Sequence, residues 1–75
     1  MALIEKLERE KLERVKIQDP VLKATYSILT DENGNKFLYI RTFGSVNREI
    51  PDKPSQQIQL GPEAIAQLKK ILEEV

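Results

Sequence analysis

Apolar and polar residues alternate one by one in the middle of this 75-residue chain and follow a helical spacing near both ends. One-by-one alternation is typical of half-buried strands, and apolar residues three and four apart are typical of amphipathic helices. We therefore expect a single α+β domain with a small antiparallel three-stranded sheet packed by helices. The chain divides into an N-terminal helix within 1–18, the sheet within 21–60 and a C-terminal helix within 61–75.

The first helix is predicted from composition and from paired charges. Residues 2–16 are rich in Ala, Leu, Glu, Lys and Arg, which all favour helices. Glu5 and Arg9 stand at the four-residue spacing that stabilises an exposed helix. Lys11 interrupts the apolar stripe, so the helix is either solvated and partly docked, or binds a partner or a second copy. We expect it to end before Pro20, because the residue before a proline avoids the helical region.

The Asn33-Gly34 pair predicts a hairpin between strands over 21–30 and 36–44, with two possible registers. A two-residue turn at this pair leaves both faces half apolar. A type I turn with Gly34 in a left-handed bulge sets Tyr26 opposite Ile40 and separates the faces. Because a one-residue shift swaps whole faces, we choose the second register. One face then carries Ala24, Tyr26, Ile28, Leu38 and Ile40, and the other carries Lys23, Thr25, Ser27, Tyr39, Arg41 and Phe43.

A strand over 56–60 leads directly into the last helix, where Gly61 is an acceptable cap and Pro62 suits the first helical position. A chain this short buries only a thin core, and without cysteine it has no disulfide to stabilise it. We therefore expect a homodimer formed through the apolar stripe of this helix. The residues assigned to dimerisation are Ile65, Leu68, Leu72 and Val75.

Composition argues against catalysis. The chain has no His and no Cys, so the commonest general base, metal ligand and thiol nucleophile are missing. Asp31 and Glu32 fit a turn better than an acid–base pair. We expect no enzymatic activity, no metal and no cofactor. No apolar run approaches the ~20 residues of a membrane span and the start does not resemble a signal peptide, which predicts a cytoplasmic protein without a membrane partner.

The strongest functional signal is the alternation of aromatic and cationic residues in 36–44. Bases of single-stranded nucleic acid stack on aromatic rings, while Lys and Arg contact phosphates. Twelve basic and twelve acidic residues cancel, which disfavours a non-specific polyanion binder but allows a local basic patch. The predicted nucleic-acid-binding residues are Lys23, Tyr39, Arg41, Phe43, Arg48, Lys53, Gln57 and Gln59.

Two alternatives remain open. The first helix or a second subunit covers the aromatic residues, with Arg41 in an ion pair. In the second alternative the chain is a protein-interaction or regulatory module that docks another protein through its helices or an exposed strand edge.

The stretch from Ile40 to Leu72 resembles the positive cofactor four family of transcriptional coactivators and single-stranded DNA-binding proteins. That family has a strand with Ile-Arg and a nearby aromatic residue, a polar loop, and an Ile-x-Leu strand leading into a helix. The matching residues are Ile40, Arg41, Phe43, Ile58, Leu60, Glu63, Ala64, Leu68, Lys69 and Leu72. The resemblance implies a curved antiparallel sheet backed by a helix, a homodimer through that helix, and DNA bound across the sheet. The expected partners are a second copy of the chain and single-stranded DNA or RNA.

The family favours a basic Lys-Gly pair before the Ile-x-Leu strand, where this chain has Gln56-Gln57. The segment from Gly44 to Gln59 also resembles small uncharacterised bacterial proteins, and this second resemblance implies no activity.

Overall fold

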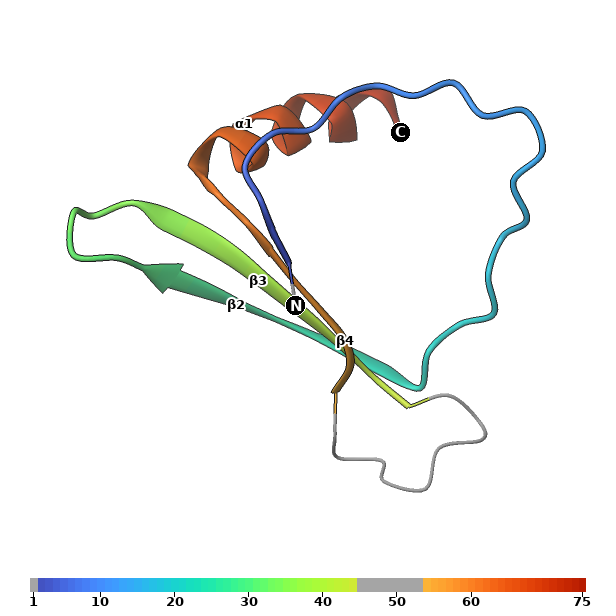
Figure 1. Cartoon of the computed structure of the whole chain (residues 1–75), viewed down its shortest axis with the longest axis horizontal. Helices are drawn as coiled ribbons and strands as arrows, with labels where there is room; N and C mark the ends of the chain where they lie inside the picture. The colour runs from blue at the N-terminus through green and yellow to red at the C-terminus, as the bar shows by residue number, and fades with distance from the viewer. Residues whose placement is uncertain (1, 45–53) are drawn as a thin grey trace.

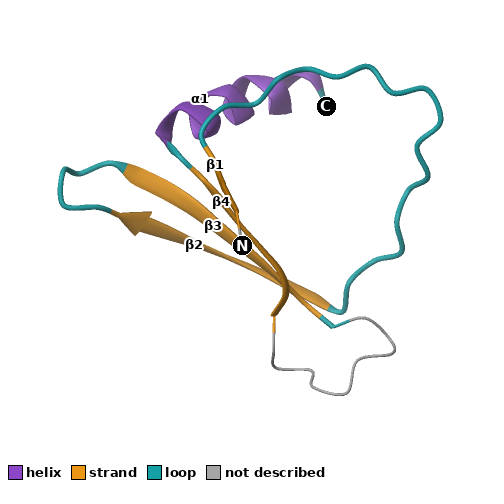
Figure 2. Cartoon of the chain, in the orientation of Figure 1, coloured by secondary structure: helices purple, strands orange, loops and turns teal. Residues whose placement is uncertain are grey.

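The computed structural model describes residues 2–44 and 54–75, which form a four-stranded mixed sheet and one α-helix (Figure 1). The elements are β1 (Ala2–Ile4), β2 (Lys23–Thr30), β3 (Lys36–Phe43), β4 (Pro54–Leu60) and α1 (Pro62–Ile71), and a 3₁₀ turn, η1 (Leu72–Glu74), follows α1. The strands lie in the order β1-β4-β3-β2. Only β1 runs parallel to its neighbour, and β2, β3 and β4 form an antiparallel meander (Figure 2). The α+β class is confirmed.

The hairpin between β2 and β3 has the predicted register. Tyr26 lies opposite Ile40, and Gly34 has a φ of 83°, a left-handed conformation that glycine adopts without steric cost. The Gly34 N–H donates to the Asp31 carbonyl over 3.2 Å. The Asp31 carboxylate accepts the backbone N–H groups of Asn33 and Asn35, each over 2.9 Å. The tip is therefore held by its own hydrogen bonds, as expected of a turn residue at Asp31.

Helix α1 begins as predicted. Gly61 is extended, with φ −77° and ψ 177°, and Pro62 occupies the first turn. The helix packs on β3 and β4, and it buries Ala64 completely. Its side of the sheet carries Ile28, Leu38 and Lys36, which lie around Ile65 and Lys69 of the helix. This face is called the helix side of the sheet, and the opposite face is called the open side.

The core is small. Among the described apolar residues only Phe43, Leu60 and Ala64 are buried. In the stripe predicted to form a dimer, Ile65 and Leu68 are half-buried, whereas Leu72 and Val75 are exposed. One short helix therefore covers only the end of the sheet at which β4 meets α1.

The predicted helix over 2–16 is wrong. Residues 2–4 form β1, which lies beside β4 with Ile4 opposite Leu60, and residues 5–22 contain no helix or strand. The Gly61 N–H donates to the Ile4 carbonyl over 2.9 Å. The sheet therefore has four strands rather than three, and it is mixed rather than purely antiparallel.

Residues 5–22 are called the N-terminal arm. Figure 1 shows the arm running beside α1 and then arching away to reach the start of β2. The Leu7 backbone exchanges two hydrogen bonds with the Gln67 side-chain amide, at 2.8 and 3.0 Å, and Arg9 pairs with Glu74. Charge pairs four residues apart stabilise a helix by only about 0.2–0.5 kcal/mol each. Long-range contacts of this kind replace the helix, because Lys11 leaves it without a continuous apolar face to bury.

Candidate nucleic-acid interface

The open side of the sheet brings four of the eight predicted binding residues into two neighbouring rows. Thr25, Arg41 and Gln57 lie opposite one another across β2, β3 and β4. Ser27, Tyr39 and Gln59 form the next row. Paired residues of neighbouring strands share a face of the sheet, so these side chains form one continuous surface. No helix covers this surface within the described residues, because α1 packs on the other side.

Arg41 lies between two aromatic rings. Its Cζ is 5.6 Å from the centre of the Tyr39 ring and 5.3 Å from the centre of the Phe43 ring. The Lys23 Nζ lies 4.7 Å from the Phe43 ring centre. Each such contact is worth about 0.5–1 kcal/mol at an exposed site. The rings therefore hold both cations on the surface of the sheet, in the positions that the period-two alternation predicts.

Phe43 and Tyr39 differ in what they offer to a ligand. Phe43 is only 7% exposed, so most of its ring is already in contact with the protein. Tyr39 is half-buried, and its hydroxyl hydrogen-bonds to Gln57 Oε1. Tyr39 is therefore the aromatic residue with exposed ring surface beside Arg41, and Phe43 lies between Arg41 and Lys23 and contacts both.

Charge is unevenly distributed between the sheet and the rest of the chain. Strands β2, β3 and β4 contain Lys23, Lys36 and Arg41 and no Asp or Glu. The described carboxylates lie in the arm, at the hairpin tip, and in α1 and η1. A net charge of zero for the whole chain is thus compatible with a basic sheet.

Phe37 lies on the same face of β3 as Tyr39, Arg41 and Phe43, at the end of the strand near Gly61. It was not among the residues predicted from the sequence, although the one-by-one alternation of 37, 39, 41 and 43 includes it. Its ring approaches Gly61, with Cε2 3.9 Å from where a Cβ on that glycine would stand. A hollow of about 330 Å³ beside it is lined by Leu3, Glu5 and Glu63. Because Glu5 and Glu63 would repel a phosphate at this end of the surface, we expect phosphates to bind at the other end, beside Lys23 and Arg41.

Arg48 and Lys53, the other two predicted cations, lie outside the described residues. Within 2–44 and 54–75 no three metal-ligating side chains come together, and no helix has the length and apolarity to cross a membrane. The pKa of the Asp31 carboxyl is lowered, mainly because the Asn35 backbone N–H donates to it, and this group lies at the hairpin tip rather than on the open side.

No family model, no curated protein and no solved structure matches this chain. The resemblance to the positive cofactor four family therefore stays a prediction from the sequence.

Proposed function

We propose that the chain is a non-enzymatic binding module that holds single-stranded nucleic acid on the open side of its sheet. The observation that supports this most strongly is the placement of Arg41 between the Tyr39 and Phe43 rings, with Lys23 beside them, on a face that α1 leaves uncovered. The bases of a single strand stack on exposed aromatic rings, and its phosphates bind cations that lie near those rings.

Each residue has a distinct role in this proposal. Tyr39 stacks one base, and Arg41 contacts the phosphate next to that base. Lys23 lies beyond Arg41 on the same side of Tyr39 and contacts a phosphate further along the nucleic acid. Gln57 and Gln59 lie on β4 beside Arg41 and Tyr39, and their side-chain amides hydrogen-bond to the exposed edges of a base. Phe43 holds the two cations in place rather than stacking a base itself, because it is only 7% exposed.

A duplex is a poor ligand for such a surface. Its bases are already stacked on one another, so Tyr39 gains nothing from them, and only the phosphate contacts remain. Two cations give a weak, salt-sensitive interaction. The proposal therefore predicts a preference for single strands, with micromolar affinity at low salt.

Titration of a fluorescent oligo-dT and of a duplex of equal length, at about 50 mM salt, tests this function. The expected result is saturable binding of the single strand and at least tenfold weaker binding of the duplex. Equal binding of both, or no binding at about 100 µM protein, would contradict the proposal.

One observation favours a second candidate, a protein-interaction module. Strand β2 lies at the edge of the sheet, and its Tyr26 and Ile28 side chains are exposed on the helix side. Exposed strand edges bind extended peptides by adding a strand. Absence of oligonucleotide binding in the titration above would favour this candidate.

A further inference from the structure

The chain exposes far more surface than a compact monomer of its mass. Its accessible surface is 6954 Å². A folded monomer of 8.6 kDa exposes about 4,700 Å². Its radius of gyration is 14.6 Å, where a compact chain of this length has about 11 Å. A compact monomer of this mass would bury the excess of roughly 2,200 Å².

The N-terminal arm contributes much of the exposed apolar surface. It is attached at both ends by hydrogen bonds. The Leu7 backbone is hydrogen-bonded to the Gln67 side chain, and the Leu22 N–H donates to the Gly44 carbonyl over 3.3 Å. Between these attachments Leu12, Val15 and Ile17 are 61%, 64% and 91% exposed. Loops of this length without secondary structure are uncommon in compact domains and generally have a function. Val15 and Ile17 are two residues apart, so in an extended chain their side chains point to the same side.

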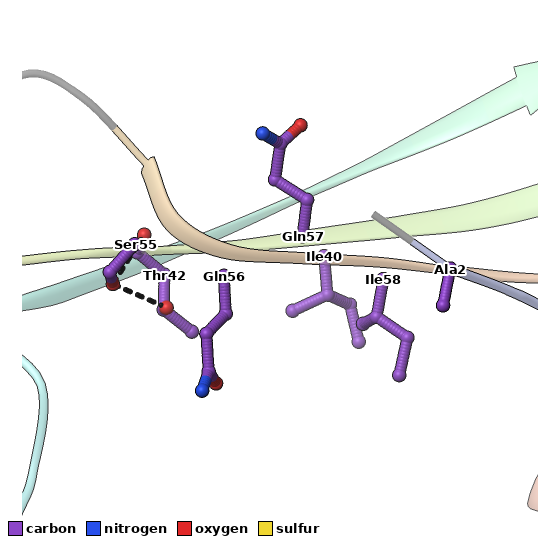
Figure 3. A pocket seen from close by; sticks show the side chains of 7 residues that line it. All are labelled: Ala2, Ile40, Thr42, Ser55, Gln56, Gln57 and Ile58. Atoms are coloured by element: carbon purple, nitrogen blue, oxygen red, sulfur yellow. Dashed lines mark hydrogen bonds between the residues drawn. The ribbon is translucent and has the colours of Figure 1, made fainter.

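The helix side of the sheet has a matching groove. It has a volume of about 420 Å³, and Ile40 and Ile58 lie in it with Ala2, Thr42 and Gln56 around them. Figure 3 shows these side chains pointing to one side of the sheet and Gln57 pointing to the other. Helix α1 does not fill the groove, because it packs near Leu38 and Leu60 at the other end of the same face.

We propose that this groove is filled by the arm of a second copy of the chain, so that two copies form a homodimer by exchanging arms. Val15 and Ile17 of one copy lie on Ile40 and Ile58 of the other. The arrangement is reciprocal, as a two-fold interface requires, because every chain carries both the arm and the groove.

A second copy fits these observations for two reasons. The excess surface of roughly 2,200 Å² per chain makes about 4,400 Å² for two chains, which is within the range of about 2,000–5,000 Å² in total that obligate homodimers bury. The apolar side chains of the arm also do not pack on the sheet of their own chain. A second copy of the chain has the same open groove, on which these side chains can pack. Exchange of an identical element between copies is a low-cost route to a dimer.

The exchanged dimer is independent of nucleic-acid binding, because the groove and the proposed binding surface lie on opposite faces of the sheet. A failure of the oligonucleotide titration therefore leaves this inference standing, and a monomeric protein leaves the binding surface of each chain intact.

Sedimentation velocity of the unmodified protein gives the first test. The expected species has twice the 8.6 kDa chain mass at micromolar concentration. Ile17→Gln should weaken dimerisation at least tenfold, whereas Glu13→Gln, the same new side chain in the same arm, should change it less than twofold. A folded monomer at high micromolar concentration would overturn the proposal and would indicate that the arm closes on its own sheet or binds another protein.

Disulfide trapping gives a second test that does not depend on the stability of a weakened dimer. The chain has no cysteine of its own, so single cysteines report only on the chosen positions. Isotope-labelled Ile17→Cys is mixed with unlabelled Gln56→Cys, or with unlabelled Gln57→Cys as the matched control, and oxidised.

Any disulfide between labelled and unlabelled chains must join two copies. The exchanged dimer predicts at least tenfold more mixed disulfide with Gln56→Cys than with Gln57→Cys. Both residues line the groove, but the Gln56 side chain points to the groove side of the sheet and the Gln57 side chain points to the other side (Figure 3). Equal yields with the two partners would overturn the placement of the arm.

Discussion

Tyr26 lies directly opposite Ile40 in the ladder between β2 and β3, and this pairing decides which side chains share each face of the sheet. It puts Tyr26 on the helix side with Ile40, and Tyr39 on the open side with Arg41. The two tyrosines of the chain therefore lie on opposite faces of one hairpin. Substitution of Tyr26 is therefore a control for substitution of Tyr39, because it removes the same side chain from the opposite face.

Tyr39→Ala should weaken binding of oligo-dT by about 1–3 kcal/mol, because one base loses its stacking surface. The dependence of affinity on salt should change little, since no phosphate contact is removed. Tyr26→Ala removes the same ring from the other face, where Tyr26 is 73% exposed, and should leave affinity nearly unchanged. Fluorescence titration of both variants at several salt concentrations measures the difference, and equal losses would argue against stacking on Tyr39.

Lys23→Ala should weaken binding to every single-stranded sequence alike. Removing one phosphate contact should flatten the slope of log affinity against log salt by about 0.7. The matched control is Lys36→Ala, since Lys36 is also an exposed lysine at the end of a strand but lies on the helix side. An identical salt slope for Lys23→Ala and the unmodified protein would exclude Lys23 from phosphate binding.

Gly34→Ala should lower the free energy of unfolding by roughly 1 kcal/mol, because a Cβ is disfavoured at positive φ. No atom lies within 4 Å of the position that the new Cβ would take, so the cost comes from the backbone and not from a clash. Gly34→Asn should cost less, since asparagine tolerates this conformation better than other residues. Urea denaturation of the two variants gives the comparison, and a larger loss for Asn than for Ala would contradict the explanation.

The pKa of the Asp31 carboxyl lies below its ordinary value of 3.8, mainly because the Asn35 backbone N–H donates to the carboxylate. A carboxyl with a lowered pKa in the folded state stabilises the fold above its ordinary pKa. That contribution is lost as the pH falls through the lower, folded-state value. The destabilisation caused by Asp31→Ala should therefore shrink as the pH falls from about 6 to about 2, measured by denaturation at each pH. A pH-independent effect would show that the charged form is not favoured in the turn.

The hairpin and the start of α1 could be predicted from the sequence because both depend on local chemistry. Asp31, Asn33 and Gly34 make a turn from side-chain hydrogen bonds and one positive φ within five residues. Gly61-Pro62 likewise starts a helix through the geometry of its own backbone. Once the hairpin register is known, the alternation of side chains places Tyr39 and Arg41 on one face, so most of the binding surface follows from the same local signal.

The arm and β1 could not be predicted, because they depend on contacts between distant residues. Ile4 lies opposite Leu60, and Leu7 is hydrogen-bonded to Gln67, sixty positions further along the chain. Helix propensity in residues 2–16 is real, but it amounts to a few tenths of a kcal/mol per residue and yields to such contacts. The burial of Phe43 was also not predictable from alternation alone, because alternation places it on the same face as the half-buried Tyr39 and Arg41.

NMR of the protein titrated with oligo-dT shows which face of the sheet holds the single strand, and we expect the open side. Signals from the Tyr39 ring and the Arg41 side chain should shift in proportion to bound oligonucleotide. Methyl signals of Ile40 and Ile58, on the opposite face, should stay nearly constant. Larger shifts at Ile40 and Ile58 than at Tyr39, or no shifts at saturating oligonucleotide, would contradict the account.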